Sequence, residues 1–99
     1  NDNMAAGALE VIKDNPAYAD VLSFGVDGTA EACLLIKEGR MTATCLQNAY
    51  TLSELLLDTA HKLLTGEETK IDTDIDNPLY TIDNVDELYA IHVKAGALE

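Results

Sequence analysis

Residues 24–47, FGVDGTAEACLLIKEGRMTATCLQ, decide the fold of this chain. Their first residues end an apolar run that starts at Val21 and stops at Gly28, which predicts a strand buried on both faces. The next segment predicts a helix that Thr29 caps and that Gly39 ends in a left-handed conformation. MTATCLQ then alternates between apolar and polar residues and predicts a second strand. A strand, a helix and a strand in this order indicate a layered, mostly parallel α/β sheet flanked by helices.

The segment before this stretch, residues 2–14, predicts a further helix. Asp2 is expected to cap it, because a carboxylate oxygen at that position can accept from free backbone N–H groups. The apolar residues recur at three- and four-residue spacing and form one face of the helix: Met4, Ala5, Ala8, Leu9 and Ile12.

Two more helices are predicted downstream. Thr51 and Glu54 form a capping box at the start of the longer one, which runs to Gly66. Asn84, with an acidic residue three positions later, is expected to cap a short last helix that ends at about His92.

The segment between these helices, residues 70–82, has an extended pattern. Residues 71–76 alternate with aspartate at every second position, and Pro78 interrupts the pattern. A charged strand broken by proline belongs at the edge of a sheet. The three aspartates also resemble the start of an EF-hand calcium loop, but Asn77 and Asp83 stand where that loop needs glycine and glutamate. An acidic edge strand is therefore expected, and calcium binding is the alternative.

The composition limits the classes of function. A chain of 99 residues holds one domain at most, and its 47% hydrophobic residues can supply a core. The net charge is −12, from 6 Lys and Arg against 18 Asp and Glu, and it repels nucleic acid. No apolar run has the length of a membrane span. We therefore expect a globular segment that does not bind nucleic acid.

Catalytic and metal-binding patterns are weak. Cys33 and Cys45 do not have CxxC spacing, so two buried thiols are expected, with a disulfide between a helix and the next strand as the alternative. No serine stands in a GxSxG motif, and no glycine-rich phosphate loop occurs. Glu54, Asp58 and His61 share a helical face, where solvated side chains are a better explanation than metal ligands. We expect no enzyme activity, no cofactor and no resident metal.

Polar residues stand where the predicted strands end. Asp27 ends the first strand, Gln47 ends the second, and Asn1 precedes the first helix, where the end of a preceding strand is expected. Ligands of open α/β sheets bind outside the carboxyl ends of the strands. These three residues are therefore the candidate ligand contacts. For Asp27 the alternative is a turn or a helix cap, which aspartate before glycine often forms.

The stretches NDNMAAGAL, FGVDGTAEACLLIKEG and MTATCLQN resemble the last third of type I periplasmic sugar-binding proteins of the ribose and galactose type. The resemblance runs from Asn1 to about Leu88 and is most specific between Gly25 and Asn48. It implies the carboxyl-terminal portion of a two-lobed protein that closes on a monosaccharide and presents it to the permease subunits of an ABC transporter. This portion would be a partial domain and not binding-competent alone.

The resemblance also implies roles for segments and residues. Residues 1–47 would belong to the carboxyl-terminal lobe, and residues 48–92 would hold the hinge crossing, a helix on the amino-terminal lobe, and the final strand and short helix. Residues 93–99 would be a tail whose Leu98-Glu99 resembles a cloning scar. The sugar contacts of the family in this region match Asn1, Asp27 and Gln47. Many of these proteins have a proline shortly after the position of Gln47, which this chain lacks.

The expected setting follows from the same resemblance. Such a protein would be periplasmic, extracellular or a cell-surface lipoprotein, with its signal peptide upstream of this segment. Exposed sheet edges would favour dimerisation of the fragment. The alternative is the effector-binding region of a lactose-repressor-type transcription regulator, which shares this fold. Those regulators usually approach the strand that resembles MTATCLQ through a proline-rich segment, whereas this chain has Glu38-Gly39-Arg40 there. This difference favours the transport protein.

Overall fold

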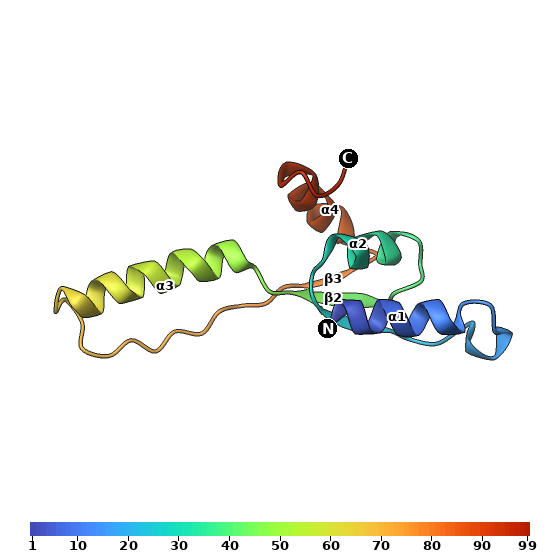
Figure 1. Ribbon diagram of the computed structural model, residues 1–99, viewed down its shortest axis with the longest axis horizontal. Coiled ribbons are helices and arrows are strands. Elements are labelled where there is room, and N and C mark those ends of the chain that lie inside the picture. The colour runs from blue at the N-terminus through green and yellow to red at the C-terminus, as the bar shows by residue number, and fades with distance from the viewer. The chain divides into compact units, whose positions relative to one another are not determined.

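The computed structural model describes residues 1–99, and the α/β class predicted from the sequence is confirmed. The chain divides into two units, a sheet unit of residues 1–47 and 78–99 and an α3 unit of residues 48–77. In chain order the elements are α1 (Asp2–Ile12), the 3-10 helix η1 (Pro16–Tyr18), β1 (Phe24–Asp27), α2 (Ala30–Lys37), β2 (Ala43–Leu46), α3 (Ala49–Leu64), β3 (Leu79–Thr81) and α4 (Val85–Lys94) (Figure 1).

The sheet has the strand order β1-β2-β3. β1 pairs with β2 in parallel, so that Phe24 lies opposite Ala43, as the strand, helix and strand pattern predicts. β3 pairs with β2 in the antiparallel direction, with Leu79 opposite Cys45. The Pro78 carbonyl lengthens this pairing by accepting from the Leu46 N–H at 2.9 Å. β3 is thus the antiparallel edge of a sheet whose other pair is parallel.

Helices cover one face of this sheet. Alternation along the strands places Gly25, Thr44 and Tyr80 on one face, where all three are buried. α1 packs on β1, α2 on β2 and α4 on β3, and the core between them is continuous. Its buried members are Leu9, Ala32, Cys33, Leu35, Ile36, Met41, Leu46, Tyr80, Val85 and Leu88.

The opposite face of the sheet is open. Phe24, Val26 and Leu79 point to it and are 62%, 40% and 55% exposed. The expectation that the first strand is buried on both faces is therefore wrong for these 99 residues. The reason is that α1, α2 and α4 all pack on the face of Gly25 and leave the face of Phe24 uncovered within the sheet unit.

Helix α1 turns most of the predicted face to the core, since Leu9 is buried and Ala5 and Ile12 pack against it, but Met4 and Ala8 are exposed. Met4 is 73% exposed, whereas Leu9 is buried and Ala6 is packed against the core. The predicted cap is also wrong, because Asn1 caps the helix and accepts from the Met4 N–H through Oδ1 at 3.0 Å. Asp2, freed from that role, points into the protein and is 1% exposed.

The predicted ends of α2 are confirmed, whereas the start of α3 differs. Thr29 caps α2 by accepting from the Ala32 N–H at 3.1 Å, and Gly39 follows the helix with φ +74°. Asn48 caps α3 by accepting from the N–H groups of Tyr50 and Thr51, so the capping box predicted at Thr51 does not form. None of the helices has the length and apolarity needed to cross a membrane.

Helix α4 begins after Asn84, as predicted, but without a side-chain cap. The Asn84 side chain instead accepts from the Thr81 N–H at 2.7 Å and donates to the Leu79 carbonyl at 3.0 Å. It therefore joins the start of the helix to both ends of β3. The helix continues past His92 to Lys94, two residues beyond the predicted end.

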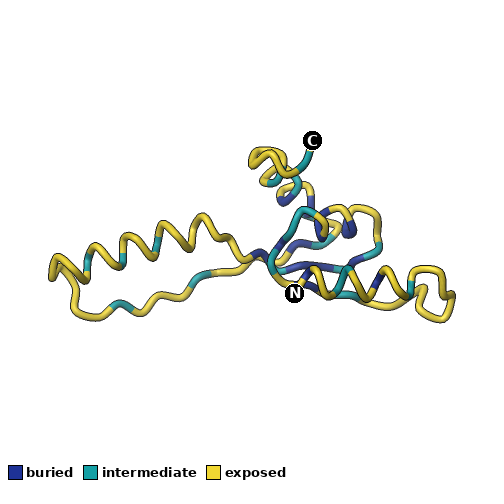
Figure 2. The backbone as a smooth tube through the Cα atoms, viewed as in Figure 1, coloured by how far each residue is buried: buried dark blue, intermediate teal, exposed yellow.

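The α3 unit has no buried residue, as Figure 2 shows along residues 48–77. Leu52 and Leu55 on α3 share a groove of about 230 Å³ with Ile71 and Ile75. The strand predicted over residues 70–76 is wrong, because these residues follow α3 instead of joining the sheet. Partial burial of Ile71 and Ile75 against apolar helix residues favours this path, and only β3 forms the predicted sheet edge.

We predict that Gly25→Ala lowers the free energy of unfolding by about 3 kcal/mol, because the added methyl group would lie 2.0 Å from Asp2 Oδ1. The matched control is Gly7→Ala in α1, where an added methyl group meets nothing within 4 Å. This control should raise the stability by roughly 0.5 to 1 kcal/mol, because alanine favours helix. Urea unfolding followed by circular dichroism measures both, and equal effects would contradict the prediction.

Candidate functional site

Asp27 and Gln47 lie together where β1 and β2 end. Because the two strands are parallel, their carboxyl ends meet at one edge of the sheet, called here the carboxyl edge. The Gln47 N–H donates to the Asp27 carbonyl at 3.2 Å, so the two residues are direct neighbours. Asp27 is half-buried and Gln47 is exposed. Their side chains are therefore accessible from the solvent at this edge.

Asn1 reaches the same edge through its neighbour Asp2. Asp2 Oδ2 accepts from the Thr29 N–H at 2.7 Å, and Oδ1 accepts from the Thr44 hydroxyl at 2.6 Å. Thr29 follows Asp27 by two residues and Thr44 precedes Gln47 by three. The structure thus brings the start of α1 to the carboxyl edge, beside the two strand ends that the sequence singled out.

The three candidate side chains offer different chemistry. Asn1 Oδ1 accepts from the Met4 N–H, which leaves the amide NH₂ as its group for a ligand. Gln47 is exposed and presents both an amide donor and a carbonyl acceptor. Asp27 presents a carboxylate, which accepts two or more hydrogen bonds. Together they form a donor, a donor and acceptor, and an anionic acceptor.

Asp27 has a strained backbone with φ +124°, a conformation that L side chains rarely adopt. Such strain persists only where the surroundings over-determine it, and it is concentrated at functional sites. The next residue, Gly28, is held tightly: its N–H donates to Thr44 Oγ1 at 3.2 Å, and a methyl group on it would lie 2.6 Å from Leu46 Cδ1. The cap of α2 is Thr29 and not Asp27, so the helix-cap alternative for Asp27 is wrong.

A fourth residue at this edge was not found from the sequence. The His92 ring, on α4, places Nε2 2.8 Å from the Gly28 carbonyl oxygen. Thr44 and Asp2 were missed in the same way, because their roles depend on hydrogen bonds to residues 16 to 42 positions away. No local pattern distinguishes such a histidine or threonine from an ordinary helix or strand residue.

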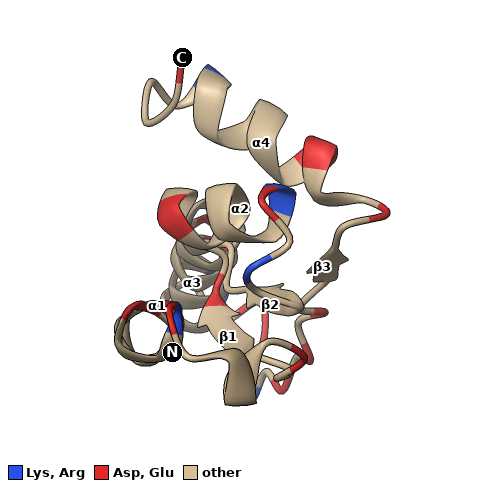
Figure 3. Ribbon diagram, turned by 90° about the vertical axis from the view of Figure 1, so that its right-hand side faces the viewer, with Lys and Arg blue, Asp and Glu red and all other residues tan.

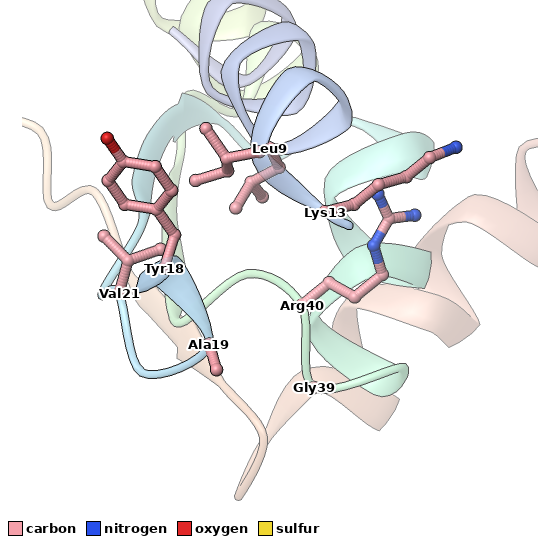
Figure 4. Close-up of a pocket in the computed structure, with 8 residues that line it drawn as sticks. Leu9, Lys13, Tyr18, Ala19, Val21, Gly39 and Arg40 are labelled. Carbon is pink, nitrogen blue, oxygen red and sulfur yellow. The ribbon is translucent and has the colours of Figure 1, made fainter. Parts of the chain in front are cut away.

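A pocket lies at the opposite edge. Its volume is about 270 Å³, and Figure 4 shows Tyr18 and Val21 on one side and Lys13 and Arg40 on the other. It is formed by the segments that precede β1 and β2, so it marks the amino ends of the strands. Lys13 and Arg40 both bond to the Glu10 carboxylate. These bonds lower the pKa of Glu10, and the bond from Lys13 has the larger effect. The two cations are thus already paired with a protein anion.

The sequence also singled out two cysteines and a group of polar residues on α3. Cys33 and Cys45 are thiols and not a disulfide, and burial raises the pKa of the Cys33 thiol. A raised pKa opposes the thiolate form that nucleophilic chemistry needs. On α3, Asp58 pairs with Lys62 at 2.9 Å, as expected of a solvated helix face.

Comparison with known proteins adds sequence similarity to this geometry. The model of the periplasmic binding protein domain family matches residues 1–68. The ribose import binding protein RbsB of Haemophilus influenzae is 42% identical over 77 residues, which are 76% of this chain and 26% of that protein. The protein of the same name in Bacillus subtilis is 37% identical over 79 residues, 80% of this chain and 25% of that protein. The chain spans about a quarter of the length of these relatives.

A solved structure has the same fold. The crystal structure of a twin-arginine translocation pathway signal protein from Burkholderia phytofirmans matches 98% of this chain and 32% of that one, with a TM-score of 0.74. The sequence identity is 22%, so this likeness concerns the fold alone. The match extends over both the sheet and the helices of the present chain.

We predict that Asp27→Gly raises the free energy of unfolding by about 1 kcal/mol, because glycine relieves a strain of roughly 1 to 3 kcal/mol. The gain is reduced by the greater freedom of glycine in the unfolded chain. Asp20→Gly is the control, since Asp20 is exposed and has no positive φ. This control should lose stability, as measured by urea unfolding, and a loss of stability at Asp27 as well would show that the backbone there is not strained.

We predict that Asp2→Asn lowers the free energy of unfolding by about 2 kcal/mol. An amide offers one acceptor oxygen, so its NH₂ group would face either the Thr29 N–H or the Thr44 hydroxyl. Asp14→Asn removes the same charge at an exposed position and should change little. Thermal unfolding of both variants compares them, and equal midpoints would contradict a structural role for the Asp2 carboxylate.

Proposed function

The chain belongs to the periplasmic binding protein domain family, and from this membership we propose that it is part of a solute-binding protein that binds a monosaccharide. The observation that carries the proposal is that Asp27 and Gln47 are bonded neighbours at the carboxyl edge, to which Asp2 joins the start of α1 with Asn1, and open α/β sheets bind ligands at this edge. The relatives are named for ribose import, which indicates the class of solute.

The chemistry of the three side chains fits a sugar. A carboxylate such as that of Asp27 accepts from two adjacent hydroxyls, and its charge strengthens these bonds. The Gln47 amide can donate to one hydroxyl and accept from another. Asn1 would donate through its NH₂ group, because its oxygen caps α1. Asp27 is therefore the strongest expected contact, and residues outside this chain would complete the site.

We also propose that the chain crosses between two lobes after Gln47. Residues 1–47 would belong to the carboxyl-terminal lobe, and α3 would pack on the amino-terminal lobe. The proposal is supported by the division of the chain between Gln47 and Asn48. Residues 78–99 group with residues 1–47, which supports a return crossing just before Pro78.

The proposed partners are a monosaccharide and the permease subunits of an ABC importer, and the proposed location is outside the cytoplasm, in the periplasm or on the cell surface. The relatives are named as import binding proteins, which favours transport over transcription regulation and over catalysis. Nucleic acid is not a proposed partner, because the net charge is −12. In Figure 3, acidic residues occur on helices and loops, whereas basic residues are few.

The test is a thermal-shift screen of the full-length protein against ribose, galactose and glucose. A bound sugar should raise the melting temperature, because saturation at a thousand times Kd adds about 4 kcal/mol to the free energy of unfolding. Asp27→Asn should reduce this shift strongly, and Asp20→Asn, at an exposed position, should not.

The isolated 99-residue chain should show no sugar binding by titration calorimetry, because it holds only part of the site. Tight binding by the isolated chain would contradict the division of the site between this segment and the rest of the protein. Absence of any shift in the full-length protein would refute sugar binding itself.

A further inference from the structure

Helix α4 contributes one side chain to the carboxyl edge, that of His92. Its Nε2 lies 2.8 Å from the Gly28 carbonyl oxygen, across 64 positions of the sequence. Because a carbonyl can only accept, Nε2 is the protonated nitrogen in this contact. The ring is half-buried, so this hydrogen bond is partly shielded from water.

With the bond from His92, both backbone polar groups of Gly28 have a partner. The N–H of Gly28 donates to Thr44 Oγ1, and its carbonyl accepts from His92, so both polar backbone groups of this residue are engaged. The residues on either side are held as well: the Asp27 carbonyl accepts from Gln47, and the Thr29 N–H donates to Asp2. Every peptide group of the turn from Asp27 to Thr29 is therefore bonded to another element.

These hydrogen bonds are important because the backbone of Asp27 is strained. A φ of +124° relaxes unless neighbouring groups prevent it, and relaxation would redirect the carboxylate. The peptide groups on both sides of Gly28 limit how the turn can rearrange. Without the bond from His92, only the bond from the Thr29 N–H to Asp2 would restrain the Gly28–Thr29 peptide group.

Helix α4 is itself fixed, so His92 is a firm anchor. Leu88 is fully buried in the core, and the Lys37 ammonium bonds to Asp86 and lies 4.7 Å from the centre of the Tyr89 ring. After His92 the helix ends in a turn in which the Ala97 N–H donates to the His92 carbonyl at 2.9 Å. The ring is thus held by contacts before and after it in the chain.

We propose that His92 is a positioning residue for the sugar site, which acts through Gly28 to hold the Asp27 carboxylate in its binding orientation. The proposal rests on the proposed function, because it concerns the same carboxylate. It assigns a binding role to α4, which lies outside residues 1–68 that match the family model.

The first experiment needs no sugar. In the full-length protein, His92→Phe keeps a ring of similar size but removes the donor, whereas His92→Gln keeps an N–H donor. The control is His61→Phe, at the exposed other histidine of the chain, on α3. Hydrogen exchange by mass spectrometry on the peptide that covers residues 24–31 should become about tenfold faster in His92→Phe only. Unchanged exchange in this peptide would overturn the proposal.

The second experiment measures Kd by titration calorimetry at a temperature where every variant is folded. His92→Phe should weaken sugar binding about tenfold, His92→Gln by less than threefold and His61→Phe not at all. In an Asp27→Asn background, the effect of His92→Phe should fall below threefold, because a residue that acts through the carboxylate loses its effect without it. A merely structural role would lower the melting temperature and leave Kd unchanged.

Two outcomes separate the two proposals. If the wild-type protein binds no monosaccharide, sugar binding is refuted, and the role of His92 in it falls, whatever the exchange data show. If the wild-type protein binds sugar but His92→Phe weakens binding equally in both backgrounds, or not at all, only the positioning role is refuted.

Discussion

The structure of the sheet unit depends on the buried carboxylate of Asp2. A carboxylate without contact to water is strongly unfavourable unless hydrogen bonds satisfy both oxygens. Here Thr29 and Thr44 supply one donor each, and the carboxylate lies directly against Gly25. The same group therefore joins α1 to the start of α2 and to both strands of the parallel pair. It explains why α1 buries the face that contains Asp2, and why a side chain at position 25 would not fit.

The hydrogen bonds that restrain the candidate site begin at this carboxylate. The Thr44 hydroxyl donates to Asp2 and accepts from the Gly28 N–H. It therefore links the Asp2 carboxylate to the turn that contains Asp27. His92 bonds to the carbonyl of Gly28 and so restrains the same turn through a second backbone group. A strained aspartate at a strand end is thus surrounded by bonds that do not involve its own side chain, and its carboxylate stays partly exposed at the carboxyl edge.

The sequence predicted which residues lie at the candidate site, but not the hydrogen bonds and backbone conformations found there. Strand ends can be located from hydrophobic patterns, and polar residues at those ends suffice to single out Asn1, Asp27 and Gln47. The pattern contains no sign that the Asn1 oxygen caps a helix, or that Asp27 has a positive φ. Both follow from how neighbouring elements pack, and they change what each side chain can offer a ligand. A pocket at the opposite edge shows in turn that hollows in the surface of this chain do not coincide with the candidate site.

The sequence by itself determined the succession of strand, helix and strand, the ends of α2 and the α/β class, because caps, glycines and apolar spacing act over a few residues. The tertiary structure decided the exact limits of the buried face of α1, since Met4 belongs to the apolar pattern but is 73% exposed, whereas Ala6 lies outside that pattern and packs against the core. It also decided that Ile71 and Ile75 follow α3 instead of joining the sheet, and that His92 reaches Gly28. These outcomes depend on contacts between distant residues, for which local propensity carries no information.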